Sequence, residues 1–152
     1  MTDCSINFFC SAQTPLRKLE LIDALNQLGN LLPDPLKQRV NIEDYASKLI
    51  NYAEMFYAKL DNKVVGLVAL YANDSKTKVA HIPFVVIAKD IQRRGVGKFL
   101  LQEAITFSKN QEMKSIWLFV HKDNLAAIAF YKSFGFQYAE NVSQKIKLIL
   151  NL

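Results

Sequence analysis

A turn with two glycines near the middle of the chain, at residues 92–98, constrains the fold most. Before it, the almost wholly apolar stretch 78–88 predicts a buried strand in the middle of a sheet. After it, apolar residues recur at helical spacing over residues 96–109 and predict a buried amphipathic helix. Glycines let a ligand approach the backbone, and the free N–H groups and dipole of a helix start attract anions. With Arg93 and Arg94 alongside, the segment is either a phosphate-binding turn or a loop with two solvated arginines.

The rest of the chain predicts strands and helices around one sheet. The apolar pattern indicates strands at residues 5–10, 55–60, 64–71, 78–88, 115–120 and 144–150, and helices at residues 15–28, 41–53, 96–109 and 124–134. We expect Asn41 to cap the second helix. The apolar face of the first helix is predicted to consist of Leu16, Leu19, Ile22 and Leu25.

Two local signals refine the predicted sheet. Asp61-Asn62-Lys63 separates two apolar runs and predicts a tight antiparallel hairpin. Pro83 cannot donate to a strand ladder, so it predicts a bulge or an unpaired stretch inside the central strand. The predicted order is strand, two helices, three strands, helix, strand, helix, strand, which describes a mixed α+β sheet with one crossover connection. We expect the chemistry to lie at that crossover.

Composition is that of a soluble globular protein. Its 152 residues are 51% hydrophobic and 22% charged, so we expect one domain over residues 1–152. No apolar run approaches the ~20 residues of a membrane span, and the N-terminus lacks the features of a signal peptide, which favours a cytoplasmic protein without membrane contact. Cys4 and Cys10 are expected to be reduced thiols, and no metal site is expected. The net charge of +5 favours an anionic ligand, while a nucleic-acid-binding domain is disfavoured because there is no basic-aromatic stripe.

A second informative segment, N-L-A-A-I-A-F-Y-K-S-F-G-F, occupies residues 124–136. Asn124 and Tyr131 are seven residues apart and therefore lie on one face of the predicted helix. Its three alanines keep the helix slim, which admits a ligand or simply allows tight packing on the sheet. Q-R-R-G-V-G-K after a strand, followed by N-x-x-A-x-x-F-Y-x-x-x-G-F, resembles the GCN5-related N-acetyltransferase (GNAT) family over residues 79–136.

The resemblance implies a GNAT-like α+β fold with a mostly antiparallel central sheet of six to seven strands, a splayed strand pair and about four helices. It also implies acetyl-CoA as acyl donor, with the turn binding the pyrophosphate and the central strand holding the pantetheine. The cofactor-binding residues it implies are Val85, Val86, Ile87, Gln92, Arg93, Arg94, Gly95, Val96, Gly97, Lys98, Asn124 and Tyr131. By the same resemblance, Asn124 contacts pantetheine and Tyr131 gives a proton to the leaving thiolate. The alternative role for Tyr131 is that of a core aromatic residue.

The general base stays open among three candidates. His81 lies six residues before Ile87, at an offset where some family members carry a glutamate or histidine base. An imidazole with a pKa near 6.5 suits this task, although His81 is equally consistent with a hydrogen-bonded strand histidine. His121 and water are the other candidates. The sequence departs from the family at Leu118-Phe119-Val120, where several relatives carry a glutamate, and at the unusual Pro83.

The predicted function is transfer of the acetyl group of acetyl-CoA to a primary amine by direct attack in a ternary complex. The alternative is a non-catalytic acyl-CoA-binding module. The predicted acceptor is a small molecule such as an amino sugar, with a peptide less favoured.

Acceptor contacts are expected in the loop 73–78 and in residues 31–57, which include Tyr45, Tyr52, Phe56 and Tyr57. A homodimer through the last strand is allowed by the apolar residues Ile146, Leu148, Ile149 and Leu150.

Overall fold

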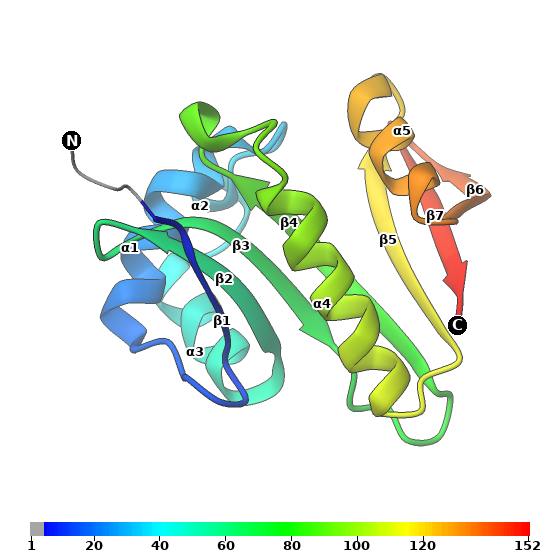
Figure 1. Ribbon diagram of the computed structural model, residues 1–152. Helices are drawn as coiled ribbons and strands as arrows, with labels where there is room; N and C mark the ends of the chain where they lie inside the picture. The colour runs from blue at the N-terminus through cyan, green and yellow to red at the C-terminus, as the bar shows by residue number, and fades with distance from the viewer. Residues whose placement is uncertain (1–4) are drawn as a thin grey trace.

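The computed structural model describes residues 5–152, which form a seven-stranded sheet with helices on both faces (Figure 1). Cys4 lies outside the described residues. The strands are β1 (Asn7–Cys10), β2 (Glu54–Leu60), β3 (Lys63–Tyr71), β4 (Val79–Ile87), β5 (Ser115–His121), β6 (Gln137–Val142) and β7 (Lys145–Asn151). The helices are α1 (Lys18–Leu28), α2 (Leu36–Arg39), α3 (Ile42–Tyr52), α4 (Val96–Asn110) and α5 (Leu125–Ser133), with short 3₁₀ turns at Gly29–Leu31 and Lys89–Ile91. The predicted α+β architecture is confirmed.

The sheet order is β1-β2-β3-β4-β5-β7-β6, and all neighbours are antiparallel except β4 and β5. Strand β4 is central, as its apolar sequence predicts. It pairs with β5 only from Val79 to His81, opposite Ser115 to Trp117. Beyond His81 the two strands separate, so within residues 5–152 the rest of β4 has no strand partner on that side (Figure 1).

A bulge in β4 lies where the strands separate. Ala69 of β3 pairs with Phe84, whereas Tyr71 pairs with His81, so two residues of β4, including Pro83, oppose one residue of β3. The bulge that Pro83 predicts is therefore confirmed.

The sheet separates two apolar cores. Helices α1, α2 and α3 cover one face, where Leu21, Leu49 and Leu67 are fully buried. Helices α4 and α5 cover the other face, where Leu101 and Ile116 are fully buried. Burial of each such side chain stabilises the fold by roughly 1.5–3 kcal/mol. Within residues 5–152, none of the helices combines the length and apolarity that crossing a bilayer requires.

Gly66 on β3 fixes the approach of α4 to the sheet. A Cβ atom at Gly66 would lie 3.0 Å from Ile87 Cδ1 and 3.1 Å from Val96 Cγ1. Glycine therefore lets the first turn of α4 pack directly over β3, which holds the turn before α4 beside the end of β4.

Local signals in the sequence are confirmed at two turns. The side chain of Asn41 accepts a hydrogen bond of 3.0 Å from the backbone N–H of Asp44, as expected for the N-cap of α3. Asp61 and Asn62 both have positive φ, at 51° and 66°, which is the geometry of a two-residue hairpin turn.

Three expectations about the helices and strands are wrong. Leu19 is 80% exposed, because the buried face of α1 is formed by Leu21, Ala24, Leu25 and Leu28. Strand β6 was not predicted, since its sequence QYAENV is exposed throughout and shows no apolar run. The last strand, β7, lies between β5 and β6, so it offers no free edge for a homodimer, and Leu148 and Leu150 belong to the core.

Candidate active site

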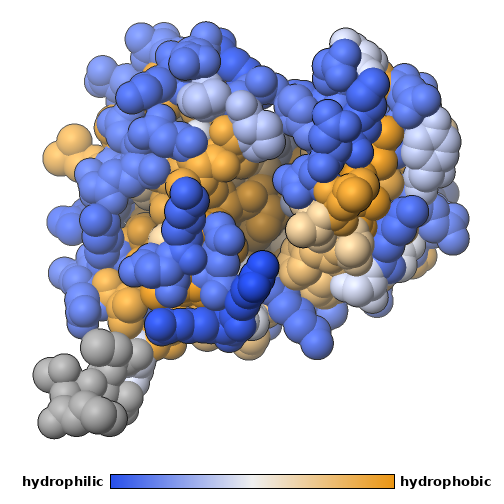
Figure 2. All heavy atoms as spheres, turned by 90° about the horizontal axis from the view of Figure 1, so that it is seen from above, coloured by the Kyte–Doolittle hydropathy of each residue, from blue (hydrophilic) through white to orange (hydrophobic). Residues whose placement is uncertain are grey.

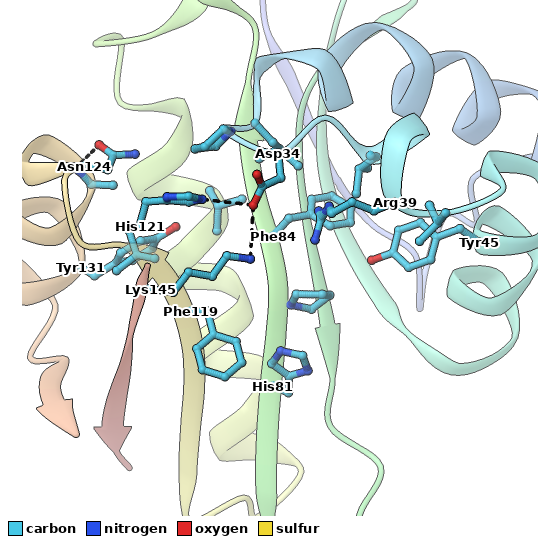
Figure 3. A pocket seen from close by; sticks show the side chains of 18 residues that line it. Asp34, Arg39, Tyr45, His81, Phe84, Phe119, His121, Asn124, Tyr131 and Lys145 are labelled. Atoms are coloured by element: carbon cyan, nitrogen blue, oxygen red, sulfur yellow. Dashed lines mark hydrogen bonds and ion pairs between the residues drawn. The ribbon is translucent and has the colours of Figure 1, made fainter. Parts of the chain in front are cut away.

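A cavity of about 340 Å³ opens where β4 and β5 separate. Seen from above, the surface is hollowed between its two halves, with hydrophobic side chains inside and hydrophilic side chains around the rim (Figure 2). The cavity is lined by Leu32, Pro33, Asp34, Leu36, Arg39, Val40, Tyr45, His81, Pro83, Phe84, Val85, Phe119, Val120, His121, Asn124, Ala127, Tyr131 and Lys145 (Figure 3). It is large enough for a small-molecule site, and both faces of the sheet contribute to it.

The first turn of α4 presents free backbone donors. Its N-cap, Gly95, has a φ of 82° and no side chain to cap the helix, and within the described residues the N–H groups of Val96, Gly97 and Lys98 have no acceptor. A Cβ atom at Gly95 would have no neighbour within 4 Å, so the space in front of the turn is open. These donors, with the helix dipole, fit the predicted anion site.

The residues of this turn contribute in different ways. Arg93 and Arg94 are exposed beside the helix start, and Arg93 itself has a φ of 66°. Val96 is 2% exposed and packs in the core, so its side chain cannot meet a ligand. The side-chain amide of Gln92 donates a 3.0 Å hydrogen bond to the carbonyl of Ile87. Gln92 therefore ties the turn to the end of β4.

The predicted cofactor residues on β4 do not all face the cavity. Val85 lines it, on the strand edge that β5 leaves unpaired. Val86 is only 5% exposed and packs in the core against α1 and α3, and Ile87 does not line the cavity. Backbone donors and acceptors on the open edge are thus the groups of β4 that could bind an extended ligand.

Helix α5 brings Asn124 and Tyr131 to the same wall, as their spacing predicts (Figure 3). The side-chain oxygen of Asn124 accepts a 3.2 Å hydrogen bond from the N–H of Ala127, so Asn124 also caps the helix. The Tyr131 ring packs edge-on against Phe130 and Phe136. Burial raises the pKa of Tyr131 well above its usual value, and the phenol stays protonated.

His81 lies on β4 in a row of rings across three strands. Its imidazole stacks on Trp117 with 3.7 Å between ring centroids, and Tyr71 lies on the other side at 6.2 Å. Burial, with smaller contributions from Lys147 and Lys48, lowers the pKa of His81 to about 4. The imidazole is therefore neutral at pH 7 and keeps a nitrogen lone pair. It is a weaker base than the imidazole with a pKa near 6.5 that was expected from the sequence.

Ion pairs not predicted from the sequence link three residues of the cavity lining. Asp34, in the loop before α2, lies 3.1 Å from His121 Nε2 and 3.6 Å from Lys145 Nζ (Figure 3). His121 is at the end of β5 and Lys145 at the start of β7, in one half of the splayed sheet. The loop of Asp34 leads into α2, which packs on the other half, so the ion pairs connect the two halves. The pKa of Asp34 is lowered, chiefly by its hydrogen bond to His121.

The expected acceptor residues are only partly brought to the cavity. Tyr45 lines it, and burial raises its pKa to about 12. Phe56 and Tyr57 are core residues, with the Tyr57 hydroxyl donating to the carbonyl of Thr14 at 2.6 Å. Tyr52 is 62% exposed, away from the cavity lining, and none of the loop 73–78 reaches the cavity.

Two further residues complete the lining. Phe119, at the position where several GNAT relatives carry glutamate, turns an apolar ring toward the cavity, so no carboxylate base is available there. Arg39 was not singled out from the sequence, because a lone arginine on a helix of four residues carries no pattern.

None of the turn residues 92–98 lines the cavity. The strands that separate at the cavity, together with the open start of α4, are the features of an acetyltransferase fold of the GNAT type. The sequence profile of the acetyltransferase (GNAT) family matches residues 23–136, and the chain belongs to that family. The chain is 32% identical over 98 residues to an uncharacterized N-acetyltransferase of Methanocaldococcus jannaschii, a match that covers 62% of this chain and 43% of that protein. The chain thus spans less than half the length of this curated relative.

Solved structures share the fold over nearly the whole chain. The ribosomal-protein-S18-alanine N-acetyltransferase from Escherichia coli superposes with a TM-score of 0.75 at 20% identity, covering 97% of this chain and 94% of that one. The PaiA N-acetyltransferase from Thermoplasma acidophilum, solved in complex with coenzyme A, gives a TM-score of 0.74 at 18% identity, covering 97% of this chain and 99% of that one.

Proposed function

We propose that the protein transfers the acetyl group of acetyl-CoA to a primary amine by direct attack within a ternary complex. The observation that carries this proposal is the cavity at the β4–β5 splay, which Asn124 and Tyr131 line from α5 and His81 from β4. Family membership supports the same activity.

In this proposal the start of α4 binds the pyrophosphate. The free N–H groups of Val96, Gly97 and Lys98 receive the anion, and Arg93 and Arg94 add charge-assisted hydrogen bonds. The residues present fit the ligand, because the space before Gly95 is open. The pantetheine then follows the unpaired edge of β4 past Val85, with Asn124 on the opposite wall.

The chemical step uses groups already in the cavity. The amine nitrogen forms a bond to the thioester carbonyl carbon, and the carbon–sulfur bond breaks. Tyr131, kept protonated by burial, gives its proton to the leaving thiolate. His81, neutral at pH 7, accepts a proton from the amine directly or through water. No cysteine nucleophile is required.

The proposed acceptor is a small molecule such as an amino sugar. Asp34, His121 and Lys145 are linked across the cavity lining next to α2, and the cavity volume of about 340 Å³ supports a compact acceptor. A peptide is the second candidate, because the Escherichia coli structural neighbour is named for a ribosomal-protein alanine.

Calorimetric titration with acetyl-CoA, followed by a thiol-release assay over a panel of amines, tests the proposal. Binding with amine-dependent thiol release is the expected result. Binding without release for any amine would favour a non-catalytic acyl-CoA-binding module. Absence of binding would refute the assignment of the α4 turn.

A further inference from the structure

The acceptor side of the cavity is rich in positive charge. Resting on the proposed function, we propose that the acceptor is a small primary amine that also carries a carboxylate or phosphate, and that Arg39 binds this anionic group. Arg39 and His81 line the same cavity, so one compact molecule can meet both (Figure 3). Arg39 is then a specificity-determining residue for the acceptor.

Arg39 is a cation without a partner. It stands at the end of α2, exposed at the cavity wall, and within residues 5–152 its guanidinium forms no ion pair or hydrogen bond. Its planar fork of donors matches the geometry of a carboxylate or phosphate. Burial raises the pKa of Tyr45, and the positive charge of Arg39 opposes this by a smaller amount.

Two lysines extend the positive region around His81. The ammonium of Lys48 lies 5.7 Å from the centre of the Tyr71 ring, and that of Lys147 lies 4.7 Å from the centre of the Trp117 ring. Tyr71 and Trp117 are the rings that flank His81 on neighbouring strands. Both ends of the aromatic row are therefore covered by cations.

Negative charge is scarce on the same walls. Among the described residues that line the cavity, Asp34 is the only carboxylate, and it is already bound to His121 and Lys145. A polyamine or aminoglycoside needs carboxylates for its additional ammonium groups, and this cavity has none to spare. The charge pattern therefore favours an acceptor whose second functional group is an anion.

Arg39 is separate from the proposed pyrophosphate site. Leu36 anchors α2 in the core with α1 and α3, whereas Val96 anchors α4 in the core on the opposite face of the sheet. Arg39 lines the cavity and none of residues 92–98 does, so we assign the guanidinium to the acceptor and not to the anion site at the α4 helix start.

Acceptor pairs with and without the anion provide the kinetic test. The pairs are L-phenylalanine with L-phenylalaninamide, and glucosamine 6-phosphate with glucosamine, with spermidine as a polycation. We expect kcat/KM to be at least about tenfold higher for the anionic member of the productive pair, and lowest for spermidine. A preference within the phenylalanine pair would indicate a carboxylate acceptor, and a preference within the glucosamine pair would indicate a phosphate acceptor. A neutral amine or spermidine as the best acceptor would overturn the inference while leaving the transferase proposal intact.

Variants test whether Arg39 is the residue that recognises the anionic group. Arg39→Gln should raise KM for the anionic acceptor about tenfold or more, while kcat, KM for acetyl-CoA and KM for the neutral partner stay unchanged. Lys37→Gln, on the same short helix but outside the cavity lining, is the matched control and should behave as wild type. Equal KM values for Arg39→Gln and wild type would refute the role of Arg39.

A binding assay makes the test independent of turnover. Trp117 is the chain's single tryptophan and stacks on His81, so its fluorescence reports occupancy beside that ring. N-acetyl-L-phenylalanine and N-acetylglucosamine 6-phosphate are titrated against their uncharged counterparts, in wild type and Arg39→Gln. Tighter binding of an acetylated anion to wild type alone supports the inference, even if no amine is acetylated. Equal affinity of charged and uncharged ligands for wild type overturns it.

Discussion

Substitution of Gly97 tests the anion site at the start of α4 most directly. A Cβ atom at this position would lie 3.5 Å from Ile87 Cγ1 and 3.6 Å from Phe130 Cζ, which are ordinary van der Waals distances. Alanine therefore fits without displacing either neighbour. Because alanine is favoured over glycine in a helix by up to ~1 kcal/mol, Gly97→Ala should keep Tm or raise it by about 1–3 °C.

Gly97→Glu adds a carboxylate beside the donors that are proposed to bind the pyrophosphate. Two like charges 4 Å apart near a protein surface repel each other by about 4 kcal/mol before screening by salt. If half of this repulsion is retained, acetyl-CoA affinity falls about thirtyfold. Gly97→Gln adds the same bulk without the charge, so we expect it to bind at least about tenfold more tightly than Gly97→Glu.

Calorimetric titration of the three variants with acetyl-CoA at about 50 mM and about 300 mM salt measures the effect, and a thermal melt of each variant controls for folding. The penalty for Gly97→Glu should shrink at the higher salt concentration. Equal affinities for the Glu and Gln variants would show that charge is not the cause. A folded Gly97→Glu protein that binds acetyl-CoA within about threefold of wild type would refute the anion site itself.

Substitutions at three further positions test separate roles within the cavity. Asn124→Ala removes the cap of α5 and should lower Tm by about 2–4 °C, whereas Asn124→Asp keeps the cap. Both variants lose the side-chain amide. If that amide contacts pantetheine, calorimetry should measure weaker acetyl-CoA binding for both. Tyr131→Phe should lower kcat by about tenfold or more and should lower kcat more than acetyl-CoA affinity, and an unchanged kcat would contradict its role as proton donor. Because the folded-state pKa of His81 is about 4, below the unfolded value, protonation of His81 should remove about 2 kcal/mol of stability from wild type as the pH falls from about 6.5 to about 4, in addition to the loss from carboxyl groups with a lowered pKa such as Asp34. His81→Gln should lack the histidine part of this loss in urea unfolding, and its acid limb of kcat/KM against pH should differ from that of wild type.

Features that depend on neighbouring residues could be predicted from the sequence. The Asp61-Asn62 turn, the Asn41 cap and the disruption at Pro83 each follow from the backbone chemistry of one to three residues. The face shared by Asn124 and Tyr131 follows from helical spacing alone.

Features that depend on long-range packing could not be predicted in the same way. Asp34 and His121 are 87 positions apart, and no local pattern indicates that they meet. The same is true of the row formed by Tyr71, His81 and Trp117, which exists because three strands align in register. Strand β6 was missed for a different reason: it lies at the sheet edge with every side chain exposed, so its sequence carries no apolar signal.

The bulge at Pro83 has a consequence for how the cavity is maintained. An unpaired strand edge tends to pair with any strand available, including its own neighbour. Pro83 has no N–H to offer to a neighbouring strand, and it lies two residues after the last β4–β5 pair, at His81 and Trp117. Pro83 therefore disfavours further pairing of β4 with β5 beyond His81. Binding then requires no strand separation, and the free energy of the new contacts goes into affinity instead of opening the sheet.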